Sequence, residues 1–324
     1  MQFRRMAAGI ALSLGFSAGA WAQVAAYPSK PVRLIVPQTP SGQVDTVART
    51  VAQQLGERLG QPLIVENRAG ANGAIGTDFV AKSPADGLTL LLSAQSAMVF
   101  NVVLRKSLPY DPIADFSSVT MVFETPYYLV VHPSVPARSV TELLALARSQ
   151  PGKLNYGTVG AGSGQHLYTE IFKSMTKTDI VHVPYKGSAQ AGTDLLTGQV
   201  QMMLQGSGFT LPQAKAGKTR VLASTGAQRM HGMPEVPTVA ESGYAGFDSF
   251  AWIAYFAPAG TPRAIVDRLN REVGEILRQP AAREKFTAMD LLLSPGTPEA
   301  LSDRVKTEIP LFARVVREAG IEPE

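Results

Sequence analysis

The chain has 324 residues, 45% of them hydrophobic, and its 30 basic and 26 acidic residues give a net charge of +4. Lys and Arg are scattered along the sequence, which excludes the clustered basic footprint of a nucleic-acid-binding protein. Because the chain contains no cysteine, its stability must come from core packing, and its length favours two domains over one.

The N-terminal segment has the three parts of a secretory signal peptide. Arg4 and Arg5 supply its charge, residues 6–19 are apolar but too few to span a bilayer, and Ala20-Trp21-Ala22 matches the small-residue cleavage pattern. We expect cleavage after Ala22 and export of the mature chain. Cleavage removes two of the 30 basic residues and no acidic residue, so the mature net charge is +2.

Short β-branched runs then alternate with amphipathic helical segments, which is typical of parallel α/β layers. Ser139-Val140-Thr141-Glu142 is a capping box that predicts a helix start, and Thr261-Pro262 is expected to supply a cap and a first-turn proline for another helix. Further helices are expected at residues 44–59 and 298–319. Strands are expected at residues 32–36, 63–66, 89–93, 127–132, 154–157, 181–184, 200–204, 221–225 and 252–257.

A Gly/Ser/Pro loop at residues 37–42 leads from the first strand into a helix. Such a loop leaves backbone N–H groups at a helix N-terminus, where the helix dipole favours an anion. We expect Ser41 to offer a hydroxyl, Gly42 to let backbone amides approach an anion, and Asp45 to fix the loop or a bridging water. Asp45 could equally cap the helix, because a bare carboxylate repels an anionic ligand.

A second loop of this kind spans residues 157–166. Gly160 and Gly162 would expose backbone amides, and Ser163 is expected to cap the next helix and to donate its hydroxyl to a ligand. His166 lies in the first helical turn, where a packing or capping role is an equal alternative. Glycines are missing two positions before and after Ser163, so the loop is not a hydrolase nucleophile elbow. Two such loops predict a carboxylate ligand held between two lobes.

Polar residues also follow three other predicted strands, and the carboxyl ends of strands form the usual rim of an α/β crevice. Lys186 could pair with a carboxylate, but a solvated surface lysine is the common alternative. The four histidines are dispersed and no metal-binding spacing occurs, so neither a metal nor a cofactor is expected. The further candidate ligand-binding residues at this rim are Gln95, Ser96, Tyr185, Lys186, Gln205 and Ser207.

Several short motifs follow one another in a fixed order. They include Tyr27-Pro28-Ser29-Lys30-Pro31, Val65-Glu66-Asn67-Arg68, Pro84-Ala85-Asp86-Gly87, His182-Val183-Pro184-Tyr185-Lys186-Gly187, Pro237-Thr238-Val239-Ala240-Glu241-Ser242-Gly243 and Ala257-Pro258-Ala259-Gly260-Thr261-Pro262. This series resembles the Bug-type receptors of the tripartite tricarboxylate transporter family over residues 27–321. The first loop departs from that family's pattern, because Gln38 and Ser41 stand where an aromatic residue and a glycine are common. We therefore expect Gln38 and Ser41 to help select the ligand.

The resemblance implies an α/β fold of the two-lobed type II periplasmic-binding-protein class, with two crossings between the lobes. Residues 1–22 would be the signal peptide, residues 23–125 with 250–324 one lobe, and residues 126–249 the other. The implied function is that of a monomeric periplasmic receptor, without catalytic residues, that delivers a small organic acid to the membrane permease subunits of a tripartite tricarboxylate-type transporter. A ligand-sensing adaptor for a signalling receptor and a periplasmic hydrolase with Ser163 as nucleophile are the alternatives.

Overall fold

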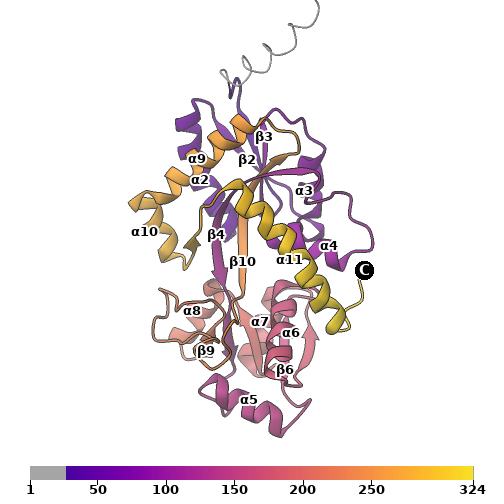
Figure 1. Cartoon of the computed structure of the whole chain (residues 1–324). Helices are drawn as coiled ribbons and strands as arrows, with labels where there is room; N and C mark the ends of the chain where they lie inside the picture. Colours follow the sequence, from indigo (N-terminus) through magenta and orange to yellow (C-terminus); the bar gives the residue numbers. More distant parts are fainter. Residues whose placement is uncertain (1–26, 324) are drawn as a thin grey trace, which may run out of the picture.

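The computed structural model describes residues 27–323, which form two α/β lobes, each built around its own sheet (Figure 1). The predicted two-lobed α/β architecture is confirmed. The predicted signal peptide, with its cleavage site after Ala22, lies outside the described residues. In the part of the chain that the structure describes, no helix combines the length and the apolar character needed to cross a membrane.

The first lobe contains a six-stranded mixed sheet in the order β11-β4-β10-β3-β1-β2. β1 pairs in parallel with β2 and β3, so the carboxyl ends of these three strands lie at the same edge of the sheet. β10 runs antiparallel to both β3 and β4. The strands are β1 (Val32–Val36), β2 (Leu63–Asn67), β3 (Thr89–Ala94), β4 (Phe116–Pro126), β10 (Phe250–Pro258) and β11 (Leu292–Leu293).

The second lobe contains a five-stranded sheet in the order β7-β6-β8-β5-β9. β6 is parallel to β7 and β8, whereas β5 is antiparallel to β8 and β9. The strands are β5 (Tyr128–Val131), β6 (Asn155–Thr158), β7 (Val181–Pro184), β8 (Met202–Gln205) and β9 (Arg220–Ser224).

The chain passes between the two sheets twice. On the way out, only Tyr127 separates β4 from β5. On the way back, residues 225–249 connect β9 to β10, which begins at Phe250 opposite Pro126 of β4. The two connections therefore lie side by side, which is the arrangement of a hinge between two lobes.

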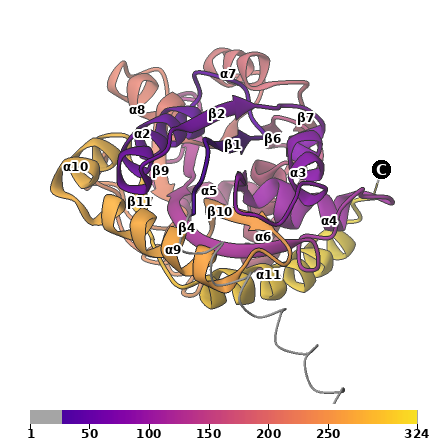
Figure 2. The same ribbon diagram turned by 90° about the horizontal axis from the view of Figure 1, so that it is seen from above.

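Helices cover both faces of the first sheet. Successive side chains along a strand point to opposite faces, so apolar residues of one strand pack against helices on both sides. Leu34 and Val36 of β1 belong to the apolar cluster of α2 (Gln43–Leu59) and α9 (Arg263–Arg278). Ile35, between them, belongs to the cluster that includes α3 (Ala74–Ala81) and α11 (Pro298–Glu318). Figure 2 shows α2 and α9 on one side of this sheet and α3 on the other. The other helical segments of this lobe are Ala71–Gly73, Ser96–Phe100, α4 (Asn101–Leu104) and α10 (Pro280–Ala288).

The helices of the second lobe are α5 (Val140–Ser149), α6 (Gly164–Thr176), α7 (Ser188–Thr197) and α8 (Ser207–Lys215). The predicted capping box at α5 is confirmed, since the Ser139 side chain accepts from the Glu142 N–H. The predicted Thr261 cap is wrong. α9 begins at Arg263, and the Thr261 hydroxyl donates instead to the Pro258 carbonyl at 2.7 Å.

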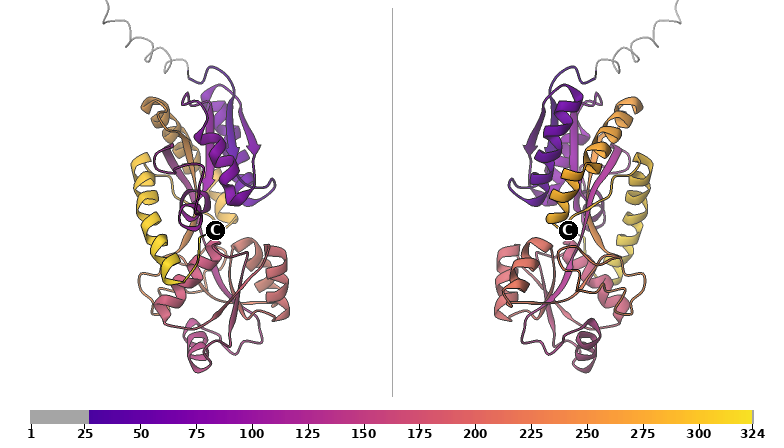
Figure 3. Two further views of the ribbon diagram at one scale, coloured as in Figure 1. Left: turned by 90° about the vertical axis from the view of Figure 1, so that its right-hand side faces the viewer. Right: turned by 90° about the vertical axis from the view of Figure 1, so that its left-hand side faces the viewer.

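The long helix α11 connects the lobes from one side (Figure 3). It belongs to the first lobe, but Phe312 of α11 packs edge-on against Tyr168 of α6, with ring centroids 5.6 Å apart. Phe100 of the first lobe meets the same two rings, at 4.8 Å from Phe312 and 6.1 Å from Tyr168. The apolar core therefore continues from one lobe into the other.

Candidate ligand-binding site

Two neighbouring cavities share Asn72 in their walls. The first, of about 310 Å³, lies at the carboxyl ends of β1 and β3 and is lined by Pro37, Gln38, Thr39, Ala69, Gly70, Asn72, Gly73, Ser93, Ala94, Ser96 and Ala97. The second, of about 360 Å³, lies between the lobes and is lined by Asn72, Asn101, Leu104, Arg105, Val159, Ala161, Gly162, Ser163, Ile321 and Glu322. Both predicted loops thus contribute residues to this region.

The first loop is held by Asp45, which is buried at the start of α2. Its carboxylate accepts hydrogen bonds from the Ser41 N–H (3.0 Å), from Asn67 Nδ2 (2.9 Å) and from Arg49 Nε (3.0 Å). Burial opposes ionisation, but these hydrogen bonds outweigh it and hold the pKa of Asp45 below its usual value. Both oxygens of Asp45 therefore have partners within the protein, as expected of a loop-fixing residue.

The remaining residues of the first loop divide into two groups. Gln38 lines the first cavity, and its carbonyl accepts from Asn67 Nδ2 at 3.1 Å. Ser41 and Gly42 are exposed and line neither cavity. Ser41 has a left-handed backbone conformation, with φ of 67°, which turns its N–H toward the carboxylate of Asp45. Pro37 and Thr39, which flank Gln38 in the sequence, line the first cavity with it.

The segment after β3 places its two predicted residues on opposite sides. Ser96 lines the first cavity. Gln95 is buried and bonded between the lobes: its Oε1 accepts from the Tyr168 hydroxyl at 2.9 Å, and its Nε2 donates to Glu308 Oε2 at 2.8 Å. Gln95 is therefore a lobe-to-lobe contact. Ser93, two residues earlier in β3, lines the cavity.

The second loop is fixed by the first turn of α6. The Ser163 hydroxyl accepts from the His166 N–H at 3.3 Å, so Ser163 caps the helix as predicted. The Gly162 N–H donates to His166 Nδ1 at 3.0 Å. A Cβ at position 162 would lie 2.6 Å from Leu104 Cδ1, so this glycine allows the loop to approach the first lobe closely. Gly160 adopts a φ of 133° and does not line either cavity.

This geometry does not place Ser163 and His166 as a nucleophile and its base. His166 Nδ1 is occupied by the Gly162 amide, and the Ser163 hydroxyl lies at the helix cap. The nearest histidine ring, that of His182, has its Nε2 2.7 Å from the hydroxyl of Thr158. The hydroxyl and imidazole groups of the loop therefore support its conformation and are not paired for nucleophilic attack.

The other predicted residues of the second lobe do not line the two cavities. The Tyr185 hydroxyl donates to Asp194 at 2.7 Å, and Lys186 is exposed. Gln205 is buried and accepts from Gln165 at 3.2 Å. Ser207 is also buried and lies 3.5 Å from the Met289 carbonyl of the first lobe.

The cavity walls include polar residues that were absent from the sequence prediction, among them Ser93, Asn72, Asn101 and Arg105. Asn72 has a left-handed conformation, and its side chain donates to Asn101 Oδ1 at 3.1 Å. Arg105 donates to the Ala71 carbonyl at 3.1 Å, and no carboxylate pairs with it among residues 27–323. The sequence signal for Asn72 is its place between Gly70 and Gly73, which both adopt positive φ angles in the structure.

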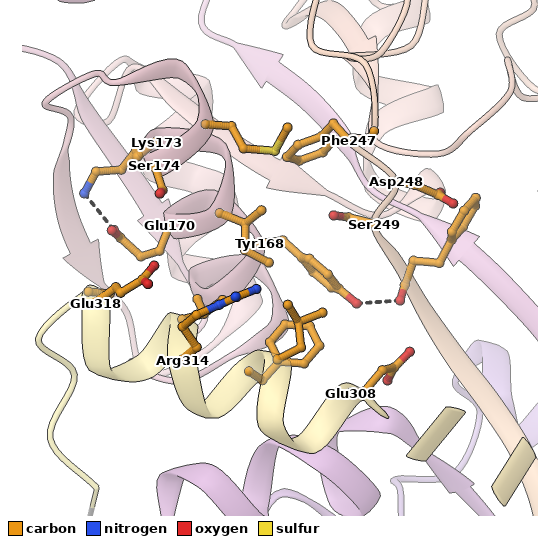
Figure 4. Close-up of a pocket in the computed structure, with 18 of the residues that line it drawn as sticks. Tyr168, Glu170, Lys173, Ser174, Phe247, Asp248, Ser249, Glu308, Arg314 and Glu318 are labelled. Atoms are coloured by element: carbon orange, nitrogen blue, oxygen red, sulfur yellow. Dashed lines mark hydrogen bonds and ion pairs between the residues drawn. The ribbon is translucent and has the colours of Figure 1, made fainter. Parts of the chain in front are cut away.

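A separate cavity of about 680 Å³ lies between α6, α11 and residues 246–250 (Figure 4). None of the predicted site residues lines it. Figure 4 shows that Lys173 meets Glu170 there, at 2.7 Å, and that the Tyr168 hydroxyl donates to the Phe250 carbonyl, at 2.6 Å. Arg304 and Glu308 form a second ion pair in this wall, whereas Asp248, Arg314 and Glu318 have no ion-pair partner among residues 27–323. Within residues 27–323, no group of three His, Asp or Glu side chains is placed to hold a metal ion.

Comparison with known proteins places the chain among transport receptors. The model of the "Tripartite tricarboxylate transporter family receptor" (TctC) matches residues 47–306. Protein BugT of Bordetella pertussis is 40% identical over 323 residues, which cover 99% of each chain. Rpa4515 of R. palustris, solved with adipate, is 36% identical with a TM-score of 0.80 over 92% of this chain and 100% of that one.

A further structure shows the same fold with another ligand. MatC (Rpa3494) of Rhodopseudomonas palustris, solved with bound malate, is 31% identical with a TM-score of 0.74 and covers 90% of this chain and 100% of that one. The predicted periplasmic-binding-protein fold is confirmed by these relatives, and the family is one of receptors, not of enzymes. The chain belongs to the TctC/Bug family of periplasmic solute-binding receptors.

Proposed function

We propose that the protein captures a small dicarboxylate between its two lobes and delivers it to the permease subunits of a tripartite tricarboxylate-type transporter. The observation that supports this most directly is the pair of cavities that meet at Asn72, one at the strand ends of the first lobe and one against the α6 loop. Relatives solved with adipate and with malate carry ligands of this class. A dicarboxylate has two charged ends, and the two cavities would each receive one.

The first carboxylate would be held by neutral donors in the first lobe. Ser93 is fully buried, and its hydroxyl has no hydrogen-bond partner among residues 27–323 although Ser93 lines the cavity. A buried hydroxyl without a partner is unfavourable, so a ligand oxygen or a bound water at this position would satisfy it. Ser96 and Gln38 line the same cavity.

The second carboxylate would lie at the N-terminus of α6. Ser163 and Gly162 line the cavity there, where the helix dipole favours an anion. Arg105 of the first lobe adds a full positive charge beside it, opposed in the cavity wall only by the exposed Glu322. A ligand that reaches both lobes would stabilise the closed form by its contacts with the second lobe.

The lobes of this proposal are residues 23–125 with 250–324 and residues 126–249, and residues 1–22 are the cleaved signal peptide. The hinge would lie near Thr125 and in the segment from Tyr244 to Trp252. Trypsin or hydrogen-exchange mapping with and without ligand would test these bounds, because closure should change protection at the hinge and at the cavity walls and leave the lobe cores unchanged.

The ligand class can be tested by thermal shift and calorimetry with adipate and malate, against the neutral diamide of adipate and a monocarboxylate. A ligand at a hundred times its Kd should stabilise the protein by about 2.7 kcal/mol. Arg105→Met should weaken dicarboxylate binding roughly tenfold, whereas Arg317→Met, which replaces an exposed arginine on α11 outside both cavities, should not. Equal stabilisation by the neutral diamide would contradict the proposal.

Delivery is a separate measurement. Uptake of labelled dicarboxylate by cells that carry the permease subunits should require the receptor, and should be lost with Arg105→Met at limiting ligand concentration but not at saturation. Uptake that is independent of the receptor would contradict the proposed delivery to the permease but not the proposed binding of a dicarboxylate.

A further inference from the structure

Two histidines from different elements stack beneath the second ligand loop. The rings of His166 on α6 and His182 on β7 lie with their centroids 3.8 Å apart and 12° from parallel. Tyr156 of β6 packs against both imidazoles, at 4.9 Å and 23° from His182 and at 6.3 Å and 29° from His166. His166 is buried and His182 half-buried, so the stacked histidines and Tyr156 form a packed cluster.

Each imidazole is tied to a different end of the loop at residues 158–163. At the end, the Gly162 N–H donates to His166 Nδ1 at 3.0 Å. At the start, His182 Nε2 lies 2.7 Å from Thr158 Oγ1, and the Thr158 hydroxyl in turn lies 3.1 Å from the Gly160 carbonyl. The two rings therefore hold the loop at both of its ends.

These contacts specify the protonation of His166. A backbone N–H can only donate, so Nδ1 must accept and the proton of the neutral ring lies on Nε2. A second proton could only bind at Nδ1. Nδ1 would then be a donor pointing at the Gly162 N–H, which is also a donor, and the hydrogen bond would be lost. Protonation of His166 and the present loop conformation are thus mutually exclusive.

The charged groups around the pair do not offset this. From α6, Glu170 accepts from Lys173 Nζ at 2.7 Å and from the Tyr156 hydroxyl of β6, so its negative charge is already paired. Burial lowers the pKa of both imidazoles, and for His182, with the neighbouring His166, it lowers the pKa to about 4. Both rings are therefore neutral at neutral pH.

We propose that His166 is a positioning residue for the ligand, and that the His166–His182 pair makes ligand affinity fall in acid by releasing the loop at Gly162 and Ser163. The inference rests on the proposed function, since this loop forms one wall of the proposed site. It assigns to His166 an indirect role, through the Gly162 amide, in place of direct contact with the ligand.

The test is calorimetry with adipate from pH 7.5 to pH 4 on three variants. His166→Asn keeps an acceptor at the position of Nδ1 but cannot take up a proton, and His166→Leu has no acceptor. His231→Asn replaces an exposed histidine remote from the stack and is the matched control. Adipate's own protonation affects all of these proteins equally.

Below the pKa of the histidine pair, we expect wild type and His231→Asn to lose more affinity for adipate than His166→Asn does. This additional loss should be up to roughly tenfold per pH unit. His166→Leu should bind weakly at every pH, and His166→Asn should restore binding at pH 7.5. Parallel loss of affinity in wild type and His166→Asn would overturn the inference.

A measurement without ligand separates this inference from the proposed function. In ¹⁵N NMR spectra of the free protein, the Gly162 amide and the His166 ring should titrate with one midpoint, and His231→Asn should leave both titrations unchanged. If adipate fails to bind at pH 7.5, the proposed ligand class is wrong, and coincident titration still supports the role of His166 in holding the loop. A Gly162 amide that does not respond when His166 titrates would overturn it.

Discussion

The hydroxyl of Tyr128 lies 2.5 Å from Oδ2 of Asp290, and this hydrogen bond joins the two lobes. Tyr128 begins β5 of the second lobe, and Asp290 follows α10 of the first. The second oxygen of Asp290 accepts from the Gly232 N–H, also in the second lobe, at 3.0 Å. Asp290 is 2% exposed, so a charged side chain of one lobe is buried against donors of the other.

Asp290→Ala should destabilise the protein by about 3 kcal/mol. The change leaves the Tyr128 hydroxyl and the Gly232 N–H without a partner in a buried position. It also puts alanine where φ is 61°, a conformation that asparagine tolerates better, so Asp290→Asn should cost less. Urea unfolding measures both. Asp303→Ala, at an exposed position on α11, is the control and should change stability by less than about 0.5 kcal/mol.

Ser93→Ala should weaken dicarboxylate binding roughly tenfold without lowering the free energy of unfolding. The Ser93 hydroxyl has no partner among the described residues, so its removal costs no internal hydrogen bond. Ser224→Ala is the matched control, because Ser224 is equally buried and equally without a side-chain partner but lines neither proposed cavity. Calorimetry on both variants decides the matter: equal affinities for Ser93→Ala and Ser224→Ala would remove Ser93 from the proposed site.

The sequence predicted the elements better than it predicted the cavity walls. The expected bounds of β1 and β7 agree with the structure to the residue, because both are short runs of β-branched residues ended by proline or glycine signals. β4 was not predicted, since Ser117, Ser118 and Thr120 interrupt its apolar residues. Its assignment as a strand comes from pairing with β10, which is a tertiary contact.

Cavity residues were harder to predict because their position depends on long-range packing. Gln38, Ser96, Gly162 and Ser163 were found from the rule that sites lie at strand ends and helix starts. Arg105 follows a short helix and reaches the cavity only because α4 packs beside the loop of the other lobe. Gln95 and Ser96 show the limit of the rule, since neighbouring residues at one strand end point to different partners.

Asp45→Asn should lower stability at pH 7 and change the response of stability to acid. The pKa of Asp45 is below its usual value because Arg49, the Ser41 N–H and Asn67 bond the ionised form despite its burial. A group whose pKa is lowered on folding stabilises the protein above its unfolded pKa and loses that contribution as pH falls through the folded pKa. The wild type should therefore lose part of its advantage over Asp45→Asn below about pH 4, as measured by urea unfolding at pH 7 and pH 3.

Removing the carboxylate of an exposed ion pair should not lower stability at pH 7 as Asp45→Asn does. Asp267→Asn removes the partner of Arg263 at an exposed site on α9 and should change stability by less than about 0.5 kcal/mol at pH 7. If Asp45→Asn leaves stability unchanged and instead weakens ligand binding, Asp45 contacts the ligand and the loop-fixing role is wrong.

The histidine stack should also produce a pH dependence of stability that is independent of any ligand. Burial and the neighbouring His166 lower the pKa of His182 from 6.5 to about 4, so the unfolded chain takes up its proton first as pH falls. Stability from this residue is complete above about pH 6.5 and is lost progressively between about pH 6.5 and pH 4, because the unfolded state binds more protons in that range. His182 is only half-buried, so solvent screening limits the loss to about 2 kcal/mol. His182→Gln, which keeps a donor near Thr158 but does not titrate, should flatten the stability curve over this range in urea unfolding of the ligand-free protein. A wild-type curve as flat as that of His182→Gln would show that His182 titrates alike in both states, and the buried neutral stack would then be wrong.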